Sequence, residues 1–196
     1  MAGTAMVFSS LMLLSCDPKS KPNTGSKLDL SKLSSKQVSN LSENQIYELL
    51  SGQDKNSLNY QTEKGHTFAM RAAAHGHLKV LILLYEQGAD LSLKDSRDNT
   101  PAMYAAVYGH VEIIEKLLEY GADVNHENNE GDTLATLAAK HGHAEVFPLL
   151  KKHSANLNHQ NRQRHTPMSL ARQENHDEVI KVLCESRPIH LSNQQH

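Results

Sequence analysis

Residues 99–125 read NTPAMYAAVYGHVEIIEKLLEYGADVN, and related segments recur along the chain at a fixed interval. Threonine, glycine and histidine positions repeat with a spacing of 33 residues. The positions in register are Thr67, Thr100, Thr133 and Thr166; Gly76, Gly109 and Gly142, followed by Asn175; and His77, His110, His143 and His176. Independent columns with one common period indicate an array of structural repeats.

Each repeat is predicted to contain two antiparallel helices. In Thr100-Pro101 the threonine hydroxyl is suited to cap free N–H groups, and proline is tolerated at the first helical position. A glycine such as Gly109 fits the reversal after this helix. Apolar residues then recur at i, i+1 and i+4, which is one stripe of a second helix. These residues are Val80, Leu81 and Leu84; Ile113, Ile114 and Leu117; Val146, Phe147 and Leu150; and Val179, Ile180 and Leu183.

The period and the residue types resemble the ankyrin repeat from about residue 58 to residue 186. The resemblance implies an all-α fold, an ankyrin-repeat solenoid of stacked helix-turn-helix units with short hairpin loops. The ankyrin-repeat domain is predicted at 41–190, with a degenerate cap at 41–62 and repeats at about 63–95, 96–128, 129–161 and 162–190. Arg172 stands where the preceding repeats have alanine, which predicts that the array ends there.

The sequence departs from the family's Thr-Pro-Leu-His motif in every repeat. Its His position is occupied by Met70, Met103, Thr136 and Ser169. We therefore expect the family's buried His hydrogen bond to be missing and the core to be thinner. Pro148 falls early in a second helix, where it should remove at most about one hydrogen bond and bend the start.

The first fifteen residues, MAGTAMVFSSLMLLS, carry no charged side chain and have the length of a signal-peptide apolar region. They are too short to cross a hydrocarbon core, which needs about 20 residues. The segment Leu13-Leu14-Ser15-Cys16 resembles the bacterial lipobox, which implies that residues 1–15 are removed and Cys16 is lipidated. A buried N-terminal helix with an incidental cysteine is the alternative. Residues 16–40 are then the lipidated cysteine and a flexible tether.

These features predict a membrane-anchored lipoprotein that faces the periplasm of a Gram-negative bacterium. Asp17 resembles the inner-membrane retention signal of some enteric lipoproteins. That rule does not hold in all bacteria, so the choice between inner and outer membrane stays open. The membrane contact is expected only through the lipid on Cys16.

Composition excludes several classes of protein. Twenty Lys and Arg balance 22 Asp and Glu, which argues against a nucleic-acid binder. Two cysteines, Cys16 and Cys184, exclude a disulfide scaffold and a cysteine-based zinc module. No HExxH motif and no phosphate-binding glycine loop occurs. We therefore expect no catalytic residue, no cofactor and no enzyme activity.

Two His-Gly-His segments, 75–77 and 141–143, have the spacing of paired metal ligands. The second histidine of each belongs to the repeating Gly-His column, so we interpret it as a structural residue hydrogen-bonded within the turn. No metal site is predicted.

By resemblance, a protein partner is expected to dock on the hairpin tips and the exposed face of each first helix. The mapped positions are Glu63, Lys64, His66, Ala74 and His75; Ser96, Arg97, Asn99, Val107 and Tyr108; Asn129, Glu130, Asp132, Lys140 and His141; and Arg162, Gln163, His165, Gln173 and Glu174. Four are basic and four are acidic, which suits a protein of mixed charge. Apart from this partner, the chain is expected to be a monomer.

The sequence therefore predicts a protein-binding lipoprotein. Some immunity lipoproteins resemble this layout of lipobox, tether and short ankyrin array, so one hypothesis is an immunity protein that occludes a toxic secreted enzyme such as a lipase. The alternatives are a periplasmic scaffold or stress-related interaction protein without a toxin partner, and a secreted effector that acts in a host cell.

Overall fold

The computed structural model describes residues 55–185. The expected signal peptide, the lipidated Cys16, the tether, most of the cap at 41–62 and the end of the last repeat lie outside the described residues. The helices are α4 (Lys55–Leu58), α5 (Phe68–Ala74), α6 (Leu78–Glu86), α7 (Pro101–Tyr108), α8 (Val111–Glu119), α9 (Leu134–His141), the 3-10 helix η2 (Ala144–Val146), α10 (Phe147–Lys152), α11 (Pro167–Gln173) and α12 (Asp177–Glu185).

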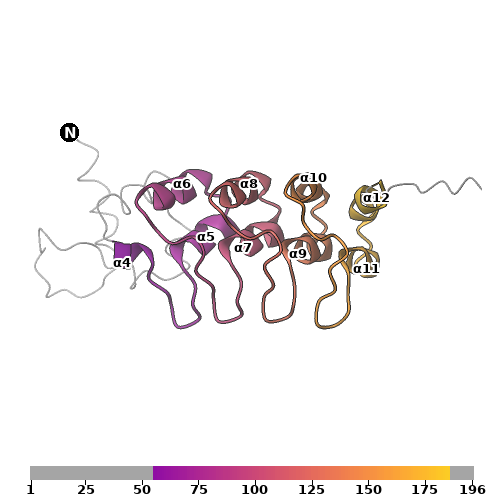
Figure 1. Cartoon of the computed structure of the whole chain (residues 1–196), viewed down its shortest axis with the longest axis horizontal. Helices are drawn as coiled ribbons and strands as arrows, with labels where there is room; N and C mark the ends of the chain where they lie inside the picture. Colours follow the sequence, from indigo (N-terminus) through magenta and orange to yellow (C-terminus); the bar gives the residue numbers. More distant parts are fainter. Residues whose placement is uncertain (1–54, 186–196) are drawn as a thin grey trace, which may run out of the picture.

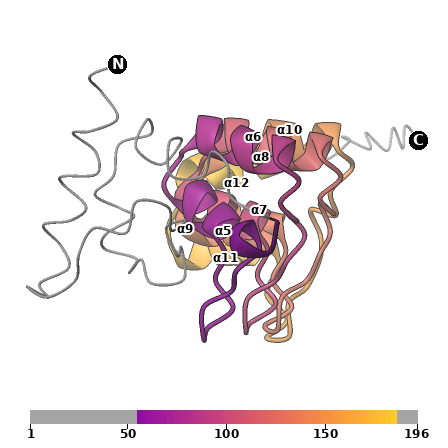
Figure 2. The same ribbon diagram turned by 90° about the vertical axis from the view of Figure 1, so that its left-hand side faces the viewer.

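The helices form two layers, from which long hairpin loops project to one side (Figure 1). Helices α5, α7, α9 and α11 form the inner layer and pack on one another in chain order. Helices α6, α8, α10 and α12 form the second layer (Figure 2). Residues 55–185 contain no strand, so the predicted all-α solenoid is confirmed. None of the helices in this part of the chain is long and apolar enough to span a bilayer.

The predicted threonine is the N-cap of every inner helix. The hydroxyl oxygens of Thr67, Thr100, Thr133 and Thr166 each accept a hydrogen bond from the N–H three residues later, at 3.1–3.4 Å. In three repeats the side chain at that third position also accepts from the threonine N–H: Met70 Sδ at 3.4 Å, Thr136 Oγ1 at 2.7 Å and Ser169 Oγ at 2.8 Å. The family's His is absent from these positions, but in these repeats the residue in its place makes a hydrogen bond of its own. The replacements complete a reciprocal cap.

The core lies between the two layers and follows the predicted stripe. All its apolar positions are buried except Ile180, which is half-buried because it lies in the last described repeat. The alanine pairs of α5, α7 and α9 are almost fully buried, which allows the inner helices to approach closely. Arg172, which replaces such an alanine, is exposed as predicted. The 3-10 helix η2 precedes α10 and Pro148, so this second-layer segment does not begin as a regular α-helix, unlike α6 and α8.

The histidine column connects successive repeats. His110 Nε2 lies 3.2 Å from the carbonyl of Ala74, and His143 Nε2 lies 2.9 Å from that of Val107. His176 Nε2 lies 3.1 Å from the carbonyl of Lys140. The prediction of a hydrogen bond within the turn is therefore wrong, because each imidazole reaches the inner helix of the repeat before it. A carbonyl only accepts, so Nε2 carries the proton in each bond.

Candidate functional site

The hairpin tips are shaped by one side chain in each repeat. Asn128 Oδ1 accepts from the N–H groups of Glu130 and Asp132, both at 2.9 Å. Asp95 and Asn161 make the same pair of bonds in the neighbouring hairpins. Such Asx turns fix a tight loop locally. The exposed residues at the tips are therefore held in a defined position.

Adjacent hairpins are also bonded to one another. Asn128 Nδ2 donates to Asn99 Oδ1, and Asn161 Nδ2 donates to Asp132 Oδ1, both at 2.8 Å. His126 Nε2 lies 2.8 Å from the carbonyl of Asp98. These contacts hold the hairpins in a row, so together they form one continuous wall beside the inner helices.

A polar cluster joins the first two repeats at the base of this wall. Tyr104 donates from its hydroxyl to Asp95 Oδ2 at 2.7 Å, and the Tyr104 hydroxyl oxygen also lies 3.1 Å from His66 Nε2. Burial alone would raise the pKa of Asp95, but hydrogen bonds from Tyr104, Asn99 and Arg97 outweigh it and lower the pKa. Burial, followed by the bond to this carboxylate, raises the pKa of Tyr104 well above its usual range. Asp95 is thus a carboxylate and Tyr104 a neutral donor at neutral pH.

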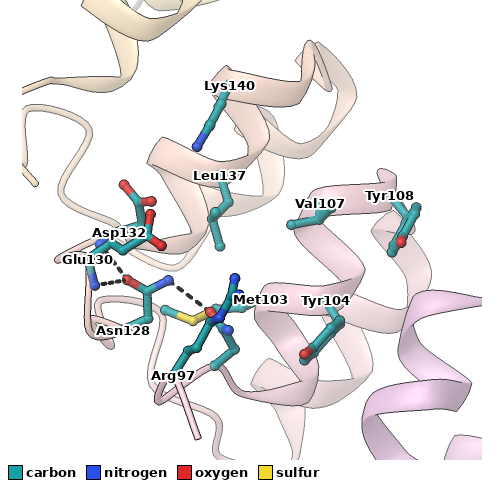
Figure 3. A pocket seen from close by; sticks show the side chains of 11 residues that line it. Arg97, Met103, Tyr104, Val107, Tyr108, Asn128, Glu130, Asp132, Leu137 and Lys140 are labelled. Carbon is teal, nitrogen blue, oxygen red and sulfur yellow. Dashed lines mark hydrogen bonds between the residues drawn. The ribbon is translucent and has the colours of Figure 1, made fainter. Parts of the chain in front are cut away.

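A pocket of about 200 Å³ lies between the hairpins and helices α7 and α9 (Figure 3). Seven of the predicted partner-binding residues line it: Arg97, Asn99, Val107, Tyr108, Glu130, Asp132 and Lys140. Four lining residues were not predicted: Met103, Tyr104, Asn128 and Leu137. Helical spacing was a usable signal for Tyr104, which is one turn before Tyr108 on the same face.

The family model described as ankyrin repeats (3 copies) matches residues 37–128 and 123–194. The chain belongs to the ankyrin-repeat family. No curated protein matches it. Ankyrin repeats bind proteins and generally act as non-enzymatic scaffolds, so protein binding is the role of this chain.

The predicted contact residues of this ankyrin array, those of the pocket included, are spread over its four hairpins and inner helices. The exposed ones are Glu63, Lys64, His75, Ser96, Arg97, Tyr108, Asn129, Glu130, Lys140, His141, Arg162, Gln163, Gln173 and Glu174. The half-buried ones are His66, Ala74, Asn99, Val107 and His165. Asp132 is only 2 % exposed and bonded to Asn161, so its predicted exposure is wrong. Its carboxylate connects two hairpins.

The column His75, Tyr108 and His141 crosses three successive inner helices at their C-terminal ends, and all three side chains are exposed. Tyr108 is 56 % exposed, the largest value among the exposed large hydrophobic side chains of residues 57–185. Burial, followed by the nearby Lys140 ammonium, lowers the pKa of His141. The column therefore offers an aromatic ring between two imidazoles.

The histidines of this ankyrin array do not converge into a metal centre within residues 55–185. No group of three or more His, Cys, Asp or Glu side chains there is placed to hold an ion. In the first His-Gly-His segment the rings of His75 and His77 lie 5.9 Å apart, centroid to centroid. In the second, His143 Nε2 is bonded to the Val107 carbonyl.

Proposed function

We propose that the array binds its protein partner in the groove between the hairpin wall and the inner helices, with Tyr108 as the central contact. The observation that carries this proposal is the exposure of Tyr108 at a pocket that also has residues of α7, α9 and two hairpins in its lining. A large aromatic ring exposed at the centre of a surface is typical of an interaction hot spot. Figure 3 shows Tyr108 at the end of α7 that lies away from the hairpin residues Asn128 and Glu130.

Structural constraints on Tyr108 are weak, which favours a binding role. Its ring stacks loosely against His110, with centroids 6.4 Å apart and planes 24° from parallel. Phe147 and Leu150, by contrast, are fully buried and serve the core. A residue that contributes little to packing can be replaced with little effect on folding.

The more specific proposal is that this chain is a lipid-anchored immunity protein that faces the periplasm and occludes a toxic secreted enzyme such as a lipase. Support comes from the resemblance of Leu13 to Cys16 to a lipobox, outside the described residues, together with a short ankyrin array. A binding surface inhibits an enzyme by covering its active site. A periplasmic scaffold without a toxin and an effector acting in a host cell are the competing proposals.

The docking proposal is tested by comparing Tyr108→Ala with Tyr85→Ala. The partner is first captured by co-purification with the whole chain and identified by mass spectrometry. Tyr108→Ala should then weaken binding by roughly 2 kcal/mol or more, about 30-fold, because a central aromatic contact is lost. The melting temperature should change little. Unchanged affinity, or a parallel loss of stability and affinity, would contradict the proposal.

Tyr85→Ala is the matched control. Tyr85 is 45 % exposed, but it belongs to α6 in the other helix layer and stacks on Tyr120 at 3.6 Å between ring centroids. Its replacement should leave affinity for the partner unchanged.

The immunity proposal has a separate test: stoichiometric addition of the purified chain should abolish the activity of a secreted enzyme encoded by a neighbouring gene. A partner that is not a toxin would favour the scaffold.

A further inference from the structure

The size of the pocket limits what it can accept. Drug-sized ligands and cofactors occupy sites of about 300–1,000 Å³, whereas a cavity of about 150 Å³ holds a benzene molecule. The pocket between α7, α9 and the hairpins measures about 200 Å³. It therefore fits one ring-sized side chain of a partner and is too small for a free cofactor.

The floor of the pocket is apolar. Met103 and Leu137 are 1 % and 7 % exposed, and Val107 is half-buried against the core. The ring of Tyr104 forms part of the wall, and its hydroxyl is already bonded to Asp95. An aromatic side chain that enters here would remove apolar surface from water, and each Å² removed stabilises the complex by about 25 cal/mol. It would meet no unsatisfied polar group on the floor.

The rim carries two cations that have no ion-pair partner among residues 57–185. Arg97 comes from a hairpin and Lys140 from α9, and Figure 3 shows them at opposite ends of the pocket. Two other lysines of the described surface do have such partners: Lys116 pairs with Glu119 at 2.6 Å, and Lys152 with Glu115 at 3.1 Å. Arg97 and Lys140 are therefore available to an external carboxylate.

Two carboxylates also belong to the pocket lining and set the net charge. Asp132 is buried and accepts a hydrogen bond from Asn161, so it is committed to the hairpins. Glu130 is exposed at the rim. The exposed rim thus has two positive groups, Arg97 and Lys140, against one negative group, which favours an acidic ligand segment.

Exposed residues continue past the pocket in both directions along the inner helices. Exposed His75 lies one repeat before Tyr108, and exposed His141 and Glu174 lie one and two repeats after it. A partner segment is therefore able to run through the groove in an extended conformation. Side chains two residues apart in such a segment lie on the same face. A ring seated in the pocket would then be flanked by side chains at i−2 and i+2.

We propose that the pocket receives an aromatic side chain of an extended partner segment that carries carboxylates two residues before and two residues after the ring, which Arg97 and Lys140 bind. This inference rests on the proposed docking groove and specifies the chemistry of the partner. Guanidinium and ammonium groups form strong charge-assisted hydrogen bonds with carboxylates, and these bonds fix the register of the segment. The apolar floor supplies part of the contact area, and the polar rim supplies the rest.

The test uses a defined probe, the peptide N-acetyl-Glu-Ala-Phe-Ala-Glu-amide, titrated into the isotopically labelled chain and followed by NMR. The expected result is saturable shifts of the Val107 and Leu137 amides. The matched peptide with both Glu replaced by Gln should bind at least three-fold more weakly, and the peptide with Ala in place of Phe should cause no saturable shift. Added salt should reduce the difference between the Glu and Gln peptides, because it screens exposed charges.

Arg97→Gln and Lys140→Gln provide the second arm. Each variant should reduce the preference for the Glu peptide over the Gln peptide, while Lys152→Gln, a distant exposed lysine, should leave it unchanged. Equal binding of the two peptides, a stronger response to a Lys-flanked peptide, or shifts outside the pocket would overturn the inference. If the natural partner depends on Tyr108 while these peptides do not bind, this inference fails and the docking proposal stands. If the peptides bind and the partner ignores Tyr108, the docking proposal fails.

Discussion

Gly109→Ala should destabilise the array through the neighbouring repeat. Gly109 has a φ of 73°, in the left-handed region. A methyl group at this position would collide with the imidazole ring of His143 and lie 2.8 Å from Glu145 Oε1. The ring must therefore move, and its bond to the Val107 carbonyl is lost.

The expected magnitude combines two effects. The left-handed conformation is unfavourable for alanine, whereas replacing glycine also makes the unfolded chain less flexible, which favours folding. The net cost of these two effects is about 1 kcal/mol. Loss of the His143 bond adds about 1 kcal/mol. Gly109→Ala should thus lower the free energy of unfolding by about 2 kcal/mol, which is a fall in melting temperature of roughly 4–8 °C for an array of this size.

Gly121→Ala is the matched control for this prediction. Gly121 also has a left-handed φ, 92°, but a methyl group there would meet nothing within 4 Å. Its loss of stability should be about 1 kcal/mol, from backbone strain alone. The assay is urea denaturation of both variants under identical conditions, read by circular dichroism.

A double variant isolates the contact between the repeats. His143→Ala removes the hydrogen bond by itself, so Gly109→Ala combined with His143→Ala should be about as stable as Gly109→Ala alone. Strictly additive losses, or equal losses for Gly109→Ala and Gly121→Ala, would refute the reasoning that this histidine couples the two repeats.

Four further predictions concern the cluster, the groove, the anchor and the histidine turns. Tyr104→Phe should destabilise the array by about 1–2 kcal/mol at pH 7, because Asp95 loses a hydrogen bond to its carboxylate. Folding lowers the pKa of Asp95, so this carboxylate stabilises the folded chain above its unfolded pKa near 3.9, and that stability is lost as the pH falls through the folded pKa. The difference in unfolding free energy between the original chain and Tyr104→Phe, measured by urea titration, should therefore narrow below about pH 4. Partner affinity, measured by calorimetry from pH 7.5 to 5, should change as His141 gains its charge. Because folding lowers the pKa of His141, the midpoint of this change should lie below about pH 6.5. An affinity that does not vary with pH would exclude His141 from the interface. Cys16→Ser should move the protein from the membrane fraction to the soluble fraction with its circular dichroism unchanged, whereas continued sedimentation with membranes would contradict lipidation. A chelator should leave the melting temperature unchanged, and a shift of several degrees restored by one metal would show that the His-Gly-His turns bind it.

Local structure was predictable from the sequence wherever one short segment contains both the cause and its effect. Thr100 caps the helix that begins at the next residue, and Gly109 takes the left-handed conformation that ends it. Both depend on backbone groups within a few residues. The period of 33 then places the same events in each repeat, so the solenoid and its core stripe follow from the spacing alone.

The partners of polar side chains were decided by the tertiary structure. His143 bonds to a carbonyl 36 residues earlier, and Asn161 bonds to Asp132, 29 residues earlier. Nothing in either local segment indicates such a contact, because the acceptor becomes available only when one repeat stacks on the next.

At the candidate site, too, some features were predictable from the sequence and others came only from the tertiary structure. The resemblance to the ankyrin repeat predicted that Arg97, Tyr108 and Lys140 lie on the hairpin tips and the exposed face of the first helices. The apolar floor of Met103 and Leu137 and the burial of Asp132 came only from the structure. A pocket between two repeats depends on how closely their helices and hairpins approach, and that distance is set by the packing of buried side chains against one another rather than by the pattern of either repeat.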